Sequence, residues 1–166
     1  MKTLRKNDGF TLIELLAVIV VLAIVTVIAT QSILPFMANS GRDAFASEAN
    51  IAIDSASDAM SLMAIGSISD SNYTKEADNK YCFTLKNLKD IGLWQKDDSN
   101  YAGTITVTVS GNSYTYATEM YNKDYYVETT SGTIKTEAKS ETETNGVGEA
   151  TDTIKAGLKV ACIPQQ

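Results

Sequence analysis

The pattern of hydrophobic and polar positions divides the chain into an apolar, an amphipathic and a mixed part. Residues 10–34 are almost continuously apolar, and Glu14 is the one formal charge among them. A helix of some twenty such residues is about 30 Å long, which matches the hydrocarbon core of a bilayer. The pattern therefore predicts a membrane-spanning helix over residues 10–34.

The residues on either side of this span indicate its orientation. Lys2, Arg5 and Lys6 precede it, so the positive-inside rule keeps the N-terminus in the cytoplasm and sends everything after Thr30 across the membrane. A secretory signal peptide has the same charge order, but its apolar region is shorter and ends in a small-residue cleavage site. No site of the A-x-A type follows this run, so we expect the apolar segment to be retained.

Residues 35–68 continue with apolar side chains at three- and four-residue spacing. The spacing predicts the amphipathic half of one long helix over residues 10–65, which Gly66 ends. Pro35 cannot donate a helical hydrogen bond and predicts a bend just before it, and Gly41 is a second weak point. The Ala-rich seam is expected to pack either against its own domain or against neighbouring copies. Its members are Phe45, Ala49, Ala52, Ala56, Ala59 or Met60, and Met63.

Residues 69–166 predict a small head, which makes the fold class α+β. Thr84 is expected to cap a short helix over residues 84–91, and Gly92 to end it. Alternating β-favouring residues predict an antiparallel meander with one face on the long helix and a Thr-rich face in solvent. The predicted strands are residues 101–109, 113–118, 125–129 and 133–136.

Three segments of the head lack a periodic pattern. Residues 70–80 are polar and turn-rich, and residues 138–150 are acidic with few apolar side chains, so both are predicted to be loops. Residues 153–164 are mixed and are predicted to be a last strand or a tucked tail.

Composition excludes several classes of function. The formal charge is −6, and an acidic surface argues against nucleic-acid binding over a broad face, although it leaves other nucleic-acid binding open. The chain has no histidine, which excludes Ser-His-Asp and Cys-His catalysis and His-ligated metals. Acidic groups at residues 70–72 and 97–100 lack the glycine and terminal glutamate of a calcium loop. We therefore predict no enzyme activity, no metal site and no cofactor.

The two cysteines, Cys82 and Cys162, both fall on the exported side of the predicted membrane. An oxidising compartment favours a disulfide, and only one pairing within the chain exists. Such a bond would close a loop of about eighty residues, which the chain-entropy view values at about 4 kcal/mol. The alternative is a pair of free, buried thiols.

The segment Lys6-Asn7-Asp8-Gly9-Phe10-Thr11-Leu12-Ile13-Glu14 resembles the class III signal of type IV prepilins and pseudopilins. The strict resemblance covers residues 5 to 30, and the rest of the chain is similar in architecture. It implies that a membrane aspartyl protease, the prepilin peptidase, cleaves between Gly9 and Phe10 and methylates the new amine of Phe10. Residues 1–9 would then be a leader. Many pilins have a helix-bending proline about twelve residues after the cleavage point, where this chain has Val21 or Leu22.

Glu14 has two interpretations. Its carboxylate lies near the cytoplasmic end of the span and can reach the headgroups by snorkelling. After cleavage, however, a cationic amine would appear at Phe10, one helical turn away. The family resemblance implies that Glu14 of one subunit meets the Phe10 amine of a neighbour inside a filament. We expect this second role.

The resemblance implies a type IV pilin, a homo-oligomer in a helical filament that serves adhesion, motility or DNA uptake. Prepilin peptidase, an assembly platform and an ATPase motor would be its partners. The precursor would reside in the cytoplasmic membrane, and the assembled subunit outside the cell. The alternatives are a pseudopilin of a type II secretion or competence system, and a single-pass membrane protein that displays a binding domain.

Overall fold

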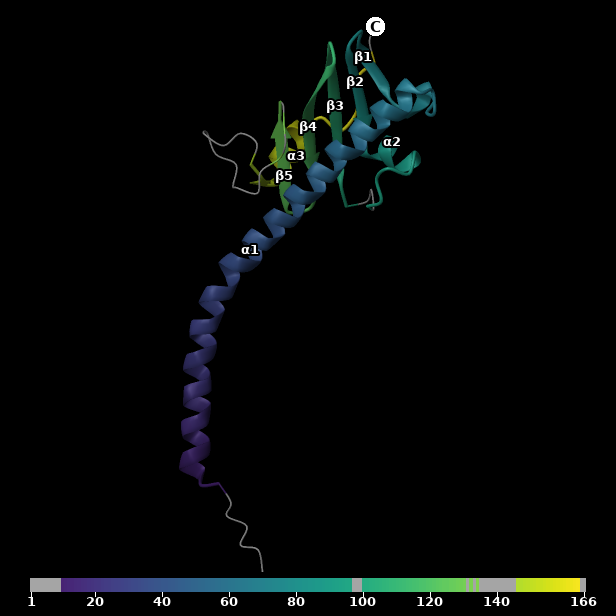
Figure 1. The fold of residues 1–166 in the computed structure, drawn as a ribbon. Helices are drawn as coiled ribbons and strands as arrows, with labels where there is room; N and C mark the ends of the chain where they lie inside the picture. Colours follow the sequence, from purple (N-terminus) through teal and green to yellow (C-terminus); the bar gives the residue numbers. More distant parts are fainter. Residues whose placement is uncertain (1–9, 97–99, 131, 133, 135–145, 165–166) are drawn as a thin grey trace, which may run out of the picture. The chain divides into compact units, whose positions relative to one another are not determined.

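The computed structural model describes residues 10–96, 100–130, 132, 134 and 146–164 (Figure 1). The chain divides into two compact units, Met1–Ser40 and Gly41–Gln166. The elements in chain order are α1 (Leu12–Ala64), η1 (Asp70–Asn72), β1 (Thr74–Ala77), β2 (Lys80–Thr84), α2 (Leu85–Asp90), β3 (Ala102–Ser110), β4 (Ser113–Tyr121), β5 (Tyr125–Thr129), β6 (Gly148–Glu149) and α3 (Asp152–Gly157).

The long helix predicted over residues 10–65 is present as α1. It runs without a break through Pro35 and Gly41, and the site of a bend stays a prediction. Gly66 ends it as expected, with a φ of +70° that glycine adopts readily. The Gly66 amide donates to the Met63 carbonyl (3.0 Å), and the Ser67 amide to the Leu62 carbonyl (2.8 Å), so two carbonyls of the last turn of α1 are satisfied.

From Gly41 onward, α1 lies across one face of the sheet (Figure 1). The Ala-rich seam is buried there against its own domain, which confirms the first of its two interpretations. The alanines let the helix approach the strands closely, because they place little between the two backbones. The core includes Phe45, Ala46, Ala49, Ala52, Ala56, Ala59 and Met60 from α1, and Phe83, Ile105, Val107, Met120 and Val127 from the strands.

The sheet has six strands in the order β1-β2-β3-β4-β5-β6, with every neighbouring pair antiparallel. Strands β3, β4 and β5 confirm three of the predicted strands. The short helix is confirmed as α2, with Thr84 accepting the Asn87 amide at 3.0 Å and Gly92 in a left-handed conformation.

The predicted loop over residues 70–80 was wrong, since most of it belongs to β1, β2 and the turn between them. β1 is a polar edge strand with an irregular register between Lys75 and Ala77, so it lacks the apolar alternation that reveals a half-buried strand. Short edge strands of this kind are held by their neighbour and not by their own pattern.

The fourth predicted strand, residues 133–136, falls mainly outside the described residues. Ile134, which is described, lies outside every strand. Its backbone is held instead by the side chain of Asn50 on α1: the Ile134 amide donates to Oδ1, and the Asn50 amide donates to the Ile134 carbonyl, both at 2.8 Å. Residues 138–145 of the predicted acidic loop are also outside the described part, and β6 lies within its remainder.

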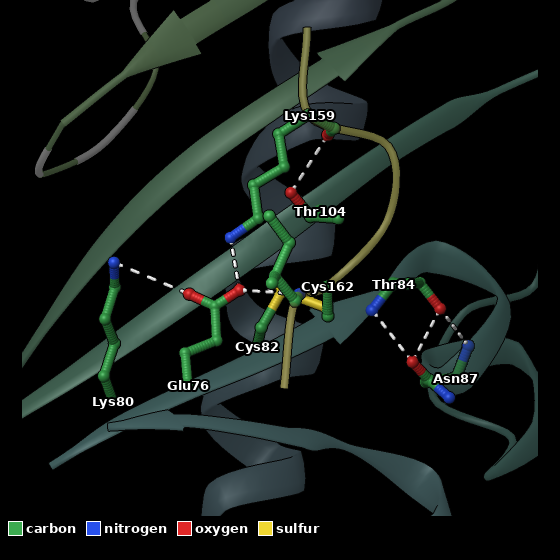
Figure 2. The surroundings of a disulfide bond; sticks show 9 residues. Glu76, Lys80, Cys82, Thr84, Asn87, Thr104, Lys159 and Cys162 are labelled. Carbon is green, nitrogen blue, oxygen red and sulfur yellow. Dashed lines mark hydrogen bonds and ion pairs between the residues drawn. A yellow bond between two sulfur atoms is a disulfide. The ribbon is translucent and has the colours of Figure 1, made fainter. Parts of the chain in front are cut away.

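The Thr-rich face of the sheet was predicted to face solvent, and this is wrong at its centre. Thr104 and Thr106 are only 1% and 6% exposed. The cover is the C-terminal segment, residues 158–164, which crosses the sheet on the side away from α1 (Figure 2). This segment follows α3, so the end of the chain is a short helix and a tucked tail, and not a last strand.

Candidate processing and assembly site

The N-terminal end of α1 is organised by a pair of residues, Thr11 and Glu14. Thr11 precedes the first helical residue, and Glu14 occupies the third helical position. The Thr11 amide and hydroxyl both donate to the Glu14 carboxylate, at 2.8 and 2.9 Å, and the Glu14 amide donates to the Thr11 hydroxyl oxygen at 3.3 Å. This reciprocal arrangement is a capping box, which satisfies backbone donors that no helical carbonyl can reach.

This role of Glu14 was missed in the sequence, although its signal was present. A threonine followed three residues later by glutamate, just before an apolar run, is the signature of a capping box. The carboxylate also lies in the first turn, where the helix dipole favours a negative charge. Glu14 therefore has a structural function within a single subunit, whatever it contacts in an assembly.

Phe10 and Thr11 precede the helix, and the Phe10 side chain is 88% exposed. Gly9 and the rest of the predicted leader lie outside the described residues. The Phe10 side of the expected cleavage point is therefore non-helical and not covered by the described part of the chain. Phe10 directly precedes the Thr11–Glu14 cap. The two predicted assembly residues, Phe10 and Glu14, therefore both lie at the N-terminal end of α1.

The segment Leu12–Gln31 is long and apolar enough to cross a membrane. None of it is buried by the described residues, and its large apolar side chains have exposed fractions between 48% for Val20 and 85% for Leu12. Exposure of so continuous an apolar surface to water is unfavourable. Lipid or other protein must cover it.

The threonine side chains of this segment bond to carbonyls of the same helix. The Thr26 hydroxyl donates to the carbonyls of Leu22 and Ala23, both at 2.9 Å, and the Thr30 hydroxyl donates to the Thr26 carbonyl at 2.8 Å. These back-bonds leave no threonine donor that needs water. Between Glu14 and Gln31 the segment therefore presents an almost continuously apolar surface.

Comparison with protein families matches residues 4–30 to the prokaryotic N-terminal methylation motif. This chain carries the prepilin-type methylation motif. The match confirms the resemblance found in the sequence, because the motif is the hallmark of type IV prepilins and pseudopilins. The α+β architecture, an apolar N-terminal helix followed by a helix on an antiparallel sheet, is pilin-like. Comparisons with curated proteins and with solved structures gave no match.

The motif indicates the general cellular setting of the chain. It implies processing by prepilin peptidase and handling by pilus-type assembly machinery. The motif and the exposed apolar helix together fit a membrane-anchored precursor. The motif belongs to structural subunits and not to an enzyme family.

A second cluster joins the C-terminal segment to the outer face of the sheet (Figure 2). Cys82 on β2 is joined to Cys162 by a disulfide, the pairing expected from the sequence. Beside it, the Glu76 carboxylate accepts a hydrogen bond from the Lys159 ammonium and forms an ion pair with Lys80 at 3.5 Å. Only the disulfide was visible in the sequence, since residues 76 and 159 come together through the fold.

The environment of Glu76 favours its charged form. Burial of the carboxyl by itself raises its pKa, but the hydrogen bonds from Lys159 and the Ile163 amide and the charges of Lys159 and Lys80 outweigh burial, so the pKa of Glu76 is lowered. One carboxylate oxygen of Glu76 and the two sulfurs lie within 4.8 Å of one another. Disulfide sulfurs are not thiolate ligands, so this group holds no metal in its oxidised form.

The acidic groups that were considered for metal binding have other contacts or lie outside the described residues. Asp70 accepts the Tyr73 hydroxyl at 2.6 Å, and Asn72 accepts the Ser69 amide at 3.1 Å. Asp97 and Asp98 are not among the described residues.

Proposed function

We propose that this chain is the structural subunit of a type IV pilus. Prepilin peptidase would cleave the precursor between Gly9 and Phe10 and methylate the Phe10 amine. The mature subunits would then polymerise into an extracellular filament used for adhesion, motility or DNA uptake. The observation that carries this proposal is the prepilin motif on a helix whose apolar surface is exposed among the described residues.

The proposed mechanism uses the same apolar surface twice. In the membrane, lipid covers Leu12–Gln31, and in the filament, other copies of this helix would cover it. Exchange of lipid for protein never exposes the surface to water, so the hydrophobic cost of leaving the bilayer is avoided. The remaining work of extraction would come from an ATPase motor acting through an assembly platform.

Glu14 would determine how neighbouring helices align in the proposed filament. Its carboxylate lies at the capped end of α1, beside the residue that would carry the new cationic amine, Phe10. In a water-poor helix bundle, an unpaired charge is strongly unfavourable. Pairing of Glu14 in one subunit with the Phe10 amine of a neighbour would therefore fix how far one helix slides along the next. The head would remain outside, with its C-terminal segment locked by the disulfide.

Intact-mass spectrometry of surface-sheared material tests the proposal. We expect a chain that begins at N-methylated Phe10 and is about two mass units lighter than its reduced form, because one disulfide removes two hydrogens. Recovery of the chain only as an uncut protein in the membrane fraction would contradict the proposal and favour a single-pass membrane protein.

The same fractionation separates the two prepilin-type candidates. A pilus subunit is expected in sheared filaments at its native expression level. A pseudopilin of a secretion or competence system would be cleaved and methylated but would stay with the cell envelope. The motif at residues 4–30 favours neither candidate over the other.

A further inference from the structure

The C-terminal segment is attached to the sheet by several contacts besides the disulfide. Lys159 is held at three points: its amide donates to the Glu119 carboxylate at 2.5 Å, its carbonyl accepts the Thr104 hydroxyl at 3.0 Å, and its ammonium contacts Glu76. Figure 2 shows the contacts of Lys159 with Thr104 and Glu76 beside the Cys82–Cys162 bond. We call the set formed by Lys159, Glu76, Glu119 and Thr104 the Lys159 clamp.

The clamp also acts on the far side of Cys162. The Ile163 amide donates to the same Glu76 oxygen at 3.3 Å. Glu76 therefore holds the chain three residues before Cys162 and one residue after it. The Glu76 side chain is only 9% exposed, so these charge-assisted bonds are shielded from water. A short stretch fixed at both ends leaves its central cysteine little freedom to move away from Cys82.

This geometry has a consequence for how the disulfide forms. The two cysteines are 80 residues apart in sequence, and closure of so long a loop by random encounter has a large entropy cost. If the C-terminal segment docks first, the contacts of the clamp offset the entropy cost of closing the loop. The two thiols then meet at a high effective concentration. We infer that the Lys159 clamp docks the C-terminal segment before oxidation, and that Glu76 and Lys159 are positioning residues for the Cys82–Cys162 bond.

The chemistry runs in two steps with a small-molecule disulfide such as oxidised glutathione as the oxidant. The Cys162 thiolate attacks one glutathione sulfur, which forms a mixed disulfide and releases one glutathione thiolate. The Cys82 thiolate then attacks the Cys162 sulfur, which forms the internal bond and releases the second glutathione thiolate. The chain loses two electrons and two protons, and the oxidant becomes two thiols. Because Cys82 is fully buried and Cys162 is only half-buried, Cys162 reacts first.

The inferred docking concerns the second step, in which the Cys82 thiolate must reach Cys162. The reduced full-length protein, folded in detergent micelles, is mixed with oxidised glutathione, quenched with acid and alkylated, and mass spectrometry resolves the reduced, mixed and closed forms. For Glu76→Gln and Lys159→Met, we expect the closing step to slow by about tenfold or more, since each loses charge-assisted hydrogen bonds. Mixed-disulfide formation is timed separately, so a change in the reactivity of the Cys162 thiol is not counted as a change in the closing rate.

Lys75→Met is the matched control. Lys75 is on the same strand as Glu76, but its ion pair is an exposed one with Asp78 and is not part of the Lys159 clamp. We expect wild-type closing rates for this variant. Closing rates in Glu76→Gln and Lys159→Met that equal those of Lys75→Met would overturn the inference.

A second measurement decides the matter even if those variants do not fold. In the full-length Cys82→Ser, Cys162→Ser protein, which cannot form the bond, we expect hydrogen-exchange protection at the amides of Lys159 and Ile163. Exchange of both amides at the rate of an unstructured chain would show that the tail docks only after oxidation, and the inference would be wrong.

Discussion

The carboxylate of Glu14 lies 2.8 Å from the Thr11 backbone nitrogen, so the one acidic residue of the apolar segment is engaged within its own subunit. Two roles thus converge on one side chain. The cap needs an acceptor at this position, and glutamine provides one as well as glutamate does. The proposed pairing with a cationic amine needs a negative charge, which glutamine lacks. The two roles can therefore be separated by substitution.

Glu14→Gln should keep the cap and remove the charge. We expect normal membrane insertion, cleavage and methylation, with a filament yield reduced by at least about tenfold, because an unpaired ammonium in a helix bundle costs several kcal/mol. Thr11→Ala is the matched variant that weakens the cap by about 1 kcal/mol and keeps the charge. Filament yield in sheared fractions is the measurement. Equal yields for Glu14→Gln and wild type would leave Glu14 with only its capping role.

The folded head should lose stability in acid through Glu76. Its pKa is lowered in the folded state from an ordinary value of 4.5, chiefly because the bonds and charges of Lys159 and its neighbours outweigh the opposing effect of burial. A lowered carboxyl pKa contributes stability above the unfolded pKa, and this contribution is lost as the pH falls through the folded pKa. Urea unfolding between pH 7 and pH 3 should show a smaller decline for Glu76→Gln than for wild type. Parallel pH profiles would argue against this role.

Tyr101 should make the head sensitive to alkali. Burial, followed by the hydrogen bond to Glu48 at 2.6 Å, raises the pKa of Tyr101 to about 12. Stability from this group is complete below its unfolded pKa, about 10, and is lost as the pH rises toward the folded value. Tyr101→Phe should cost about 1.5 to 3 kcal/mol at pH 7, as for a lost bond to a charged group, and should flatten the decline above pH 10. Denaturant titrations at pH 7, 9 and 11 measure both effects, and a wild-type profile in the variant would refute the prediction.

Gly103 is required by a close approach of two strands. A Cβ there would lie 2.3 Å from the Glu119 carbonyl oxygen and 2.6 Å from the Met120 Cα, and neither backbone atom can move without opening the sheet. We expect Gly103→Ala to lower the free energy of unfolding by about 3 kcal/mol or more.

Gly157→Ala is the control for that substitution. A Cβ at Gly157 meets no atom within 4 Å, so we expect a change within about 1 kcal/mol of zero. The midpoints of thermal or urea unfolding compare the two variants. A similar loss of stability in both variants would mean that the glycine-to-alanine change itself, and not the strand contact at Gly103, causes the effect.

The apolar run, the prepilin motif, α1, α2 and the three central strands could all be predicted from the sequence. Each is a local or periodic pattern whose signal lies within a few turns of helix or a single strand. The capping role of Glu14 also depends on a local pattern, the T-x-x-E spacing of Thr11 and Glu14, so it could have been predicted from the sequence. The Cys82–Cys162 pairing was also available, since the chain offers no other pair.

Contacts between distant segments account for what the sequence left open. β1 is polar, so only its pairing with β2 makes it a strand, and Ile134 is held by Asn50 across 84 residues. The strand pattern predicts that Thr104 faces solvent, but in the fold the C-terminal segment covers it. Nothing in the local sequence distinguishes Lys159 from a surface lysine, and only the fold places it beside Glu76. The sequence by itself determined the helical rod, its processing motif and the central strands, because their signals are short-range. The tertiary structure alone decided how the C-terminal segment is anchored, because that depends on which charges and hydrogen-bonding groups the folded sheet places beneath it.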